Sequence, residues 1–382
     1  AKNLATLPFI FKHIAIMPDS HQGYGMPIGG VMATKGVIVP NAVGVDIGCG
    51  MCAVKTSLTE LDTETLKKIM GEIRKTIPVG MNKHKEKQDE SLMPKNPPIN
   101  GNDRKMWLNM EGYKIASEEY GNALLSLGTL GGGNHFIEIQ KGNDGHIWIM
   151  IHSGSRNLGF TVAKHYNDLA VELNKKWHTS VPEKHELAFL PIESEEGQTY
   201  IREMNYCVEF ALANRKLMMD RVLNIFDKIT TWTVGRISER TMTYEPMINI
   251  AHNYASMENH FGTNVMVHRK GATLAREGTI GIIPGSQGTK SYIVKGKGNK
   301  DSFESCSHGA GRKMGRKQAE RELNLEIEKK QLDDMGVLHA IRGKGDLDEA
   351  PGAYKDINVV MENQKDLVEI MVELTPLAVI KG

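Results

Sequence analysis

The chain has 382 residues and a formal net charge of +1, with 40% hydrophobic and 24% charged residues. This is ordinary globular composition with ample material for a core, and the balanced charge restricts any nucleic-acid site to a local patch. No apolar run approaches the length of a membrane span, and the four cysteines do not make a disulfide framework. We therefore expect a reduced, cytoplasmic protein that does not associate with membranes.

β-Strands are predicted in both halves of the chain. They are short apolar segments separated by glycine turns, over 11–17, 29–34, 36–40, 42–47 and 147–152, with β and glycine character returning over 247–308. The polar, proline-bearing stretch 82–105 predicts a mobile surface loop.

Helical periodicity occupies the middle of the chain. Over 162–177 and 200–228 apolar residues recur at steps of three and four, which predicts a helical hairpin inserted over about 162–230. A further helix is predicted at about 312–330. Because candidate ligands fall on both sides of the insertion, we expect a single α+β domain over 1–382, with a glycine-rich β core around the site.

Six residues with metal-binding or nucleophilic side chains occur where apolar runs meet glycine or other small residues: Asp46, Cys49, His135, His152, His252 and His308. A strand that ends in glycine lets the backbone approach a bound ion and directs the last side chain into a cleft. A thiolate, imidazoles and a carboxylate suit a transition metal, and a bridging thiolate could serve two ions. Paired metals clamp phosphoryl oxygens, and a spare histidine could be a covalent nucleophile. The chemistry leaves open which of the four histidines that is.

Three further patterns accompany these residues. Cys52 forms a C-x-x-C pair with Cys49, but their odd separation points them to opposite faces of an extended segment, so we expect Cys52 in the core. The hydroxyls and guanidinium that follow His152 suit a phosphate. A glycine-rich loop leads from His308 into the predicted basic helix, where Arg312 and Arg316 would share one face near an anion site.

Ten segments resemble, in order, the motifs of the RtcB family of RNA ligases. They are MPDSHQGYGMPIGG (17–30), VGVDIGCGM (43–51), GTLGGGNHFIEI (128–139), HSGSRNLG (152–159), AHNYA (251–255), RKGAT (269–273), IPGSQGTKSYIV (283–294), SCSHGAGR (305–312), AYKDI (353–357) and the terminal IKG. The pattern departs at Gly315, where the family often has serine. The family usually carries a few dozen residues before the position of Ala1, so we expect a preceding segment.

The resemblance implies a role for each matching residue. It assigns His308 as the guanylylated nucleophile and Asp19 as a residue that helps to activate the RNA end. It assigns two Mn²⁺ ions to Asp46, Cys49, His135, His152 and His252. GTP contacts are expected from Asn134, Phe136, Glu138, Pro284, Ser286, Tyr354 and Lys381, and RNA phosphate contacts from Arg156, Arg312 and Arg316. Strand alternation would put Asn134, Phe136 and Glu138 opposite His135.

The resemblance therefore implies a GTP- and manganese-dependent RNA ligase acting in tRNA splicing or RNA repair. It would join a 2′,3′-cyclic phosphate or 3′-phosphate end to a 5′-hydroxyl through histidine–GMP and RNA 3′-end-pp-G intermediates. An accessory activating protein is left open as a partner. Two alternatives remain from the residues themselves. A dinuclear-metal phosphohydrolase would need no guanine pocket, and a catalytically silent RNA-binding module would need no nucleophile.

Overall fold

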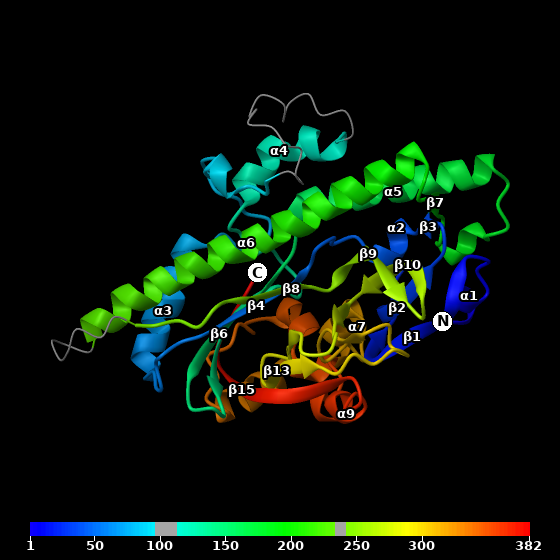
Figure 1. Cartoon of the computed structure of the whole chain (residues 1–382). Helices are drawn as coiled ribbons and strands as arrows, with labels where there is room; N and C mark the ends of the chain where they lie inside the picture. The colour runs from blue at the N-terminus through cyan, green and yellow to red at the C-terminus, as the bar shows by residue number, and fades with distance from the viewer. Residues whose placement is uncertain (96–112, 234–241) are drawn as a thin grey trace.

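The computed structural model describes residues 1–95, 113–233 and 242–382, in which helices and antiparallel sheets are mixed along the chain (Figure 1). One sheet has seven strands in the order β12 (Ile280–Ile283), β13 (Ser291–Gly296), β15 (Val368–Lys381), β5 (Phe136–Gly142), β6 (Ile147–Ser153), β4 (Gly50–Lys55) and β8 (Ile248–Ala251). A second sheet has four, in the order β1 (Ile10–His21), β2 (Ile28–Thr34), β10 (Thr263–Lys270) and β9 (Asn253–His260). Two-stranded pairs are formed by β3 (Val37–Ile38) with β7 (Leu190–Pro191), and by β11 (Ala272–Leu274) with β14 (Ser305–Ser307).

The centre of the seven-stranded sheet is buried on both faces. Every residue of β6 is buried, which confirms the predicted strand over 147–152. Cys52 lies on the face that packs against α3 (Thr63–Thr76) and α6 (Glu195–Thr233), whereas its neighbour Met51 belongs to the core on the other face. Cys52 is therefore a core residue, as its spacing from Cys49 predicts.

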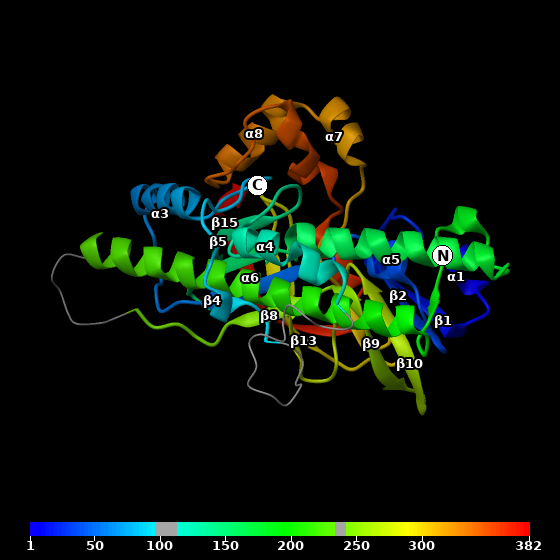
Figure 2. The ribbon, with the colours of Figure 1, turned by 90° about the horizontal axis from the view of Figure 1, so that it is seen from above.

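The predicted helical hairpin is present and longer than its periodicity indicates. α5 (Arg156–Lys176) and α6 pack against each other, and in Figures 1 and 2 they run side by side as the longest helices drawn. Their connection contains η3 (Glu183–His185) and β7. With α4 (Ile115–Ser126) and α2 (Pro40–Val43) the two helices share one apolar cluster, which also includes Ala255 of β9 and Met266 of β10, so the insertion belongs to the core beneath the four-stranded sheet.

Two predicted elements are wrong. Instead of a strand over 42–47, the short helix α2 is followed by a loop in which Gly44 and Gly48 adopt positive φ, a conformation that breaks an extended run. The basic helix predicted over 312–330 is two helices, α7 (Arg316–Glu322) and α8 (Leu325–Asp334). Asn324 separates them, because its side chain accepts hydrogen bonds from the first backbone N–H groups of α8.

The C-terminal part of the chain returns to the central sheet. After η4 (Lys344–Glu349), η5 (Pro351–Ala353) and α9 (Ile357–Glu362), strand β15 inserts between β13 and β5. The remaining elements are α1 (Lys2–Ala5) and η1 (Glu90–Leu92). Part of the loop predicted over 82–105 lies outside the described residues. Within them, no helix is long and apolar enough to cross a membrane.

Candidate active site

The predicted site residues meet at a cavity of about 1190 Å³ that lies between the two large sheets and is here called the His308 cavity. Strands of both sheets contribute to its wall, as does the loop that follows β14. Of the predicted residues, the lining includes Asp46, Cys49, Asn134, Phe136, Glu138, His152, His252, Pro284, Ser286, His308, Arg312, Arg316, Tyr354 and Lys381. The fold thus brings together residues that are more than 300 positions apart in the sequence.

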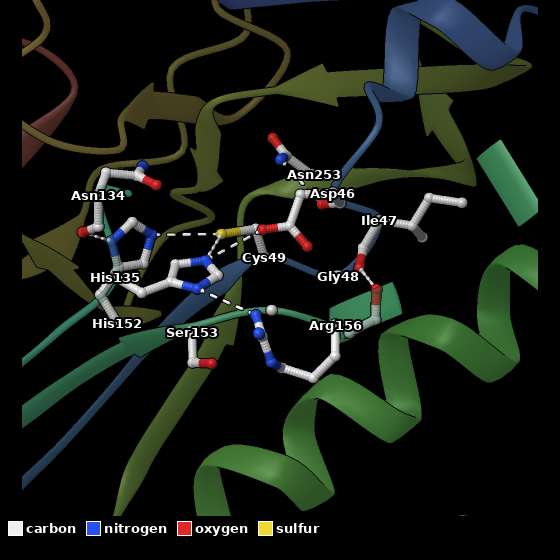
Figure 3. A network of polar contacts seen from close by, with 12 residues as sticks. Asp46, Ile47, Gly48, Cys49, Asn134, His135, His152, Ser153, Arg156 and Asn253 are labelled. Carbon is white, nitrogen blue, oxygen red and sulfur yellow. Dashed lines mark hydrogen bonds and ion pairs between the residues drawn. The ribbon is translucent and has the colours of Figure 1, made fainter. Parts of the chain in front are cut away.

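The five predicted metal ligands form one cluster, here called the ligand cluster. Figure 3 shows four of them, Asp46, Cys49, His135 and His152. Cys49 Sγ lies 3.4 Å from His135 Nε2 and 3.3 Å from His152 Nε2. His152 Nε2 lies 3.4 Å from His252 Nε2, and His135 Nε2 lies 3.1 Å from Asp46 Oδ2. Two overlapping sets arise, one with His152 and His252 and one with Asp46 and His135, and Cys49 belongs to both. This is the arrangement that a bridging thiolate requires.

The ligand cluster holds more hydrogen-bond acceptors than protons. Backbone carbonyls of Leu130 and Asn134 accept from Nδ1 of His135 and His152, at 3.0 and 3.1 Å, so the Nε2 atoms facing Cys49 carry lone pairs. Burial lowers the pKa of His152 well below its ordinary value, so this imidazole is neutral. Burial also raises the pKa of the Cys49 thiol, and its single proton cannot satisfy both rings. A shared cation would satisfy all of these lone pairs, so the residues fit a metal centre.

Helix α6 fixes the loops that carry these ligands. Arg215 is fully buried, and its Nη1 donates to the carbonyl oxygens of Gly48 at 3.0 Å and Ser153 at 2.8 Å. Its Nε donates to Asn249 Oδ1 at 2.8 Å. Gly48 precedes Cys49 and Ser153 follows His152, so one guanidinium sets the spacing of the two ligands. The apolar periodicity of the helix did not indicate that Arg215 would be buried or that it would bind these carbonyls.

The glycines beside the ligands are required by close approach. A Cβ at Gly50 would lie 2.0 Å from the carbonyl oxygen of Ile250, which pairs β4 with β8. A Cβ at Gly154 would lie 2.2 Å from Asp46 Oδ1. Side chains at these positions would push the Cys49 loop away from the neighbouring strands.

His308 is oriented by Asp19, a strand residue with no exposed surface. Asp19 Oδ2 accepts from His308 Nδ1 at 2.6 Å and from the His308 backbone N–H at 3.1 Å. The proton therefore sits on Nδ1, and Nε2 carries the lone pair. The His308 ring lies 4.8 Å from the ring of His252, at the edge of the ligand cluster. Asp19 thus acts on this histidine in addition to any role toward RNA.

Glu138 lies in the wall of the His308 cavity and is only 3% exposed. Burial raises its pKa to about 8, although Lys381 and Gln140 act in the opposite direction. Phe136 lines the same cavity, with Lys381 Nζ 5.6 Å from the centre of its ring. His135 precedes β5, belongs to the ligand cluster and is not among the residues that line the cavity, so its separation from this group does not arise from strand alternation.

Glu349 joins four of the predicted residues and was missed by the sequence analysis. Its Oε1 contacts Nη1 of Arg312 and Arg316, each at 3.1 Å, and its Oε2 contacts Lys381 Nζ at 3.1 Å and accepts from the hydroxyl of Tyr354. Burial alone would raise the pKa of Glu349, but these neighbours lower it. Arg312 precedes α7, so the two arginines do not share a helical face; they meet on this carboxylate instead.

The loop with Pro284 and Ser286 is tied to the strand of Glu138. The Ser286 backbone N–H donates to Thr289 Oγ1 at 2.6 Å, which closes the turn. Ser291 Oγ accepts from the Gly285 backbone N–H at 3.1 Å and from the Gln140 side chain at 3.0 Å. Ser291 therefore ties the loop to β5.

The sequence predicted that the hydroxyls following His152 help to bind a phosphate, and this part of the prediction is wrong. Ser153 donates to the carbonyl oxygen of Leu130 at 2.7 Å, and Ser155 donates to that of Ile47. Both hydroxyls are buried and support the ligand loops. Arg156 packs behind His135, with its Nε donating to Thr129 Oγ1 at 3.2 Å. It is not among the residues that line the His308 cavity, and its predicted RNA contact stays a prediction.

Lys270 is a further cavity residue that the sequence analysis did not single out. It is 7% exposed, and its Nζ donates to the carbonyl oxygens of Tyr24 and Asn41 at 2.5 and 2.9 Å. Burial lowers its pKa to about 8. Its place in the RKGAT motif, which resembles a family motif, was the available signal.

These features define an enzyme-like site in which a candidate metal centre and an oriented histidine open into one cavity of nucleotide size. The model of the family described as tRNA-splicing ligase RtcB matches residues 1–382. The chain is 42% identical to the RNA-splicing ligase RtcB of Escherichia coli K12, over the whole chain and 92% of that relative. It is 33% identical to the tRNA-splicing ligase RtcB of Thermococcus kodakarensis, over the whole chain and 90% of that relative.

The chain therefore belongs to the RtcB family of RNA ligases. The RNA-splicing ligase RtcB homolog 2 of Entamoeba dispar is a more distant relative, at 32% identity over the whole chain and 82% of its own length. The likeness thus spans bacterial, archaeal and eukaryotic proteins and covers every element of the site.

Replacing Arg215 by methionine is expected to lower the free energy of unfolding by about 3 kcal/mol, because the carbonyls of Gly48 and Ser153 lose a buried, charged donor. Mn²⁺ affinity should fall with it, measured by calorimetry on the folded fraction. Lys216→Met is the matched control, since Lys216 is exposed and pairs only with Asp220 among the described residues. Equal effects of the two substitutions would contradict the role of Arg215.

Replacing Cys49 by alanine is expected to prevent both overlapping sets from retaining a metal ion when the protein is loaded with Mn²⁺, because this sulfur is common to them. Cys52→Ala should retain the metal, since Cys52 packs in the core. The measurement is metal content by mass spectrometry after gel filtration. Full metal retention in Cys49→Ala would exclude the thiolate as a ligand.

Proposed function

We propose that this RtcB-family ligase uses GTP and Mn²⁺ to join RNA ends carrying a 2′,3′-cyclic phosphate or 3′-phosphate to 5′-hydroxyl ends. The single observation that carries the proposal is the pairing of His308 with Asp19 at the edge of the ligand cluster. It supplies an imidazole with a fixed tautomer whose free nitrogen faces a cavity wide enough for a nucleotide.

In the proposed reaction, His308 Nε2 attacks the α-phosphorus of GTP and pyrophosphate leaves. Nδ1–H remains hydrogen-bonded to Asp19, which stabilises the positive charge that develops on the ring. A 2′,3′-cyclic phosphate end is first opened by water, which breaks the bond from phosphorus to the 2′-oxygen and leaves a 2′-hydroxyl and a 3′-phosphate. The RNA 3′-phosphate then takes GMP from the histidine to form the RNA 3′-end-pp-G intermediate. A 5′-hydroxyl finally displaces GMP and forms the phosphodiester. The covalent intermediate divides one difficult transfer into easier ones.

Asp46, Cys49, His135, His152 and His252 would hold two Mn²⁺ ions, which supply charge neutralisation for the phosphoryl oxygens when bound. The short distances around Cys49 support this assignment, because one sulfur lies within 3.4 Å of two imidazole nitrogens.

The guanine base is proposed to bind where Asn134, Phe136 and Glu138 line the His308 cavity. A carboxylate there would accept hydrogen bonds from the N–H groups on the Watson–Crick edge of guanine, which adenine cannot offer in the same pattern. Pro284 and Ser286 would contact the same nucleotide, since their loop is tied to β5. Tyr354 and Lys381 line the same cavity and would contact the nucleotide while paired with Glu349.

RNA phosphates are proposed to bind Arg312 and Arg316, with Arg156 as a further contact. The two arginines line the His308 cavity while paired with Glu349, so they remain positioned in the absence of RNA. A role in tRNA splicing or RNA repair, a cytoplasmic location and an accessory activating protein stay predictions.

Incubation with α-labelled GTP and Mn²⁺ is expected to give a covalent GMP adduct that is acid-labile and alkali-stable, as a phosphoramidate is. His308→Ala should abolish it, and Asp19→Asn should slow its formation about a hundredfold or more, because the ring loses its orienting carboxylate. Labelled protein is quantified on denaturing gels. An adduct of undiminished yield in His308→Ala would remove this residue as the nucleophile.

GTP affinity is expected to depend on pH through Glu138. The raised pKa keeps this carboxyl protonated at neutral pH, and only the ionised form accepts both guanine N–H groups. Affinity should therefore rise about twentyfold from about pH 6.5 to about pH 8.5, since binding must first remove the proton. The measurement uses His308→Ala protein, in which no adduct forms.

Two controls accompany this titration. Glu138→Gln should bind GTP without this pH dependence, because its side chain does not ionise. ATP should bind the parent protein weakly, and its affinity should not change with pH in this way. Adenine does not offer the two N–H groups of guanine that the Glu138 carboxylate would accept. The same pH dependence in Glu138→Gln would place guanine recognition elsewhere.

A further inference from the structure

A second histidine, His21, lies in the His308 cavity and has no part in the scheme above. Its Nδ1 lies 3.1 Å from the backbone carbonyl oxygen of Asp19. A carbonyl oxygen only accepts hydrogen bonds, so the proton of His21 is on Nδ1 and the lone pair is on Nε2. Among the described residues, no group is hydrogen-bonded to this Nε2.

Asp19 holds His21 and His308 in the same tautomer by two different groups. Its carboxylate binds Nδ1 of His308, and its backbone carbonyl binds Nδ1 of His21. The two rings are nearly parallel, with an interplanar angle of 24° and centroids 6.5 Å apart. Two imidazoles in the same tautomer thus line one cavity, and only that of His308 is used as a nucleophile.

The joining step needs a base that the residues assigned so far do not supply. The attacking 5′-hydroxyl must lose its proton, whereas the departing GMP leaves as a phosphate and needs none. Asp19 is fully buried: its Oδ2 already accepts two hydrogen bonds from His308, and its Oδ1, which has no hydrogen-bond partner, has no exposed surface through which an RNA hydroxyl could reach it. His21 is half-buried in the cavity wall, and its Nε2 is the neighbouring free lone pair.

We propose that His21 is the general base that accepts the proton of the RNA 5′-hydroxyl during joining, an inference that rests on the proposed function. The 5′-oxygen forms a bond to the phosphorus of the 3′-phosphate. The bond from that phosphorus to the oxygen bridging to GMP breaks, and GMP leaves with the electron pair. The proton moves to His21 Nε2 and from there to solvent.

The surroundings of His21 keep it unprotonated near neutral pH. Burial lowers its pKa, and the nearby charges of His308 and Lys355 lower it further, while Asp19 acts in the opposite direction. Asp19 lies on the same strand, His308 follows β14, and Lys355 reaches across from the segment before α9 to the carbonyl oxygens of Pro18 and Ser20.

The experiment compares two steps in the full chain carrying His21→Gln. Guanylylation is followed with α-labelled GTP, and joining is followed in single turnovers from RNA that already carries a 3′-pp-G end. Joining at neutral pH should fall about a hundredfold, whereas guanylylation should change by no more than about threefold. The parent rate should level off above the lowered pKa of His21, and the variant rate should keep rising with pH because hydroxide replaces the base.

His13→Gln is the matched control. His13 lies on the same strand, its Nε2 is 2.8 Å from the carbonyl oxygen of Asp301, and its ring stacks on Phe303 outside the cavity. It should leave both steps unchanged. Equal losses of guanylylation and joining in His21→Gln would show a structural role only, and an unchanged joining rate would equally overturn the proposal. A parent protein that joins 3′-pp-G RNA but forms no adduct would contradict the proposed function and still leave this comparison readable.

Discussion

The buried contact between helix α6 and the ligand loops is the constraint on which the site depends. Arg215 has no exposed surface, and its guanidinium binds the backbone carbonyl of Gly48, in the loop before β4, and that of Ser153, at the end of β6. Its neighbour Asn214 accepts from the backbone N–H groups of Gly128 and Thr129 at 2.7 and 3.2 Å. Asn214 also donates to the carbonyl oxygen of Gly154. A displaced helix would leave several buried backbone groups without partners, so the helix and the ligands keep one relative position.

That rigidity lets the protein hold acceptor atoms against one another. The outer nitrogens of His135 and His152 are bound to backbone carbonyls, which fixes the tautomers and directs both Nε2 atoms at Cys49. Such a cluster is unfavourable without a cation, because lone pairs face each other in a region with little water. The helix, the sheet and the backbone carbonyls therefore prepare a site whose stability depends on what it binds.

A second buried charge, Glu349, holds several side chains in place elsewhere in the wall of the His308 cavity. Glu349 gathers two arginines, Lys381 and Tyr354, which come from α7, the preceding loop, the end of β15 and the segment before α9. Gly382, which follows Lys381, packs so closely that a Cβ there would lie 1.5 Å from the carbonyl oxygen of Gly131. Lys381 is thereby held between Phe136 and Glu349 and is an ordered part of the cavity wall.

The sequence by itself determined the chemical identities at the site. Glycine-flanked Cys49 and the histidines at the ends of apolar runs indicated a metal centre, and the helical periodicity over 162–230 indicated the hairpin. It also placed Cys52 in the core, because a period of two decides which face a strand residue occupies. These signals are local, and local patterns depend mainly on the residues themselves.

Only the tertiary structure decided the partners. Glu349 and Arg215 give no sequence signal, because a charged residue on a helix or loop is usually solvated and their burial depends on chain segments far away. The strand predicted over 42–47 failed because Gly44 and Gly48 take a backbone conformation that brings Cys49 to the ligands. The helix predicted over 312–330 failed at two points: α7 begins only at Arg316, so Arg312 lies before it and meets Glu349, and Asn324 caps the start of a second helix. Pairing between distant residues is a property of packing, and no single window of sequence contains it.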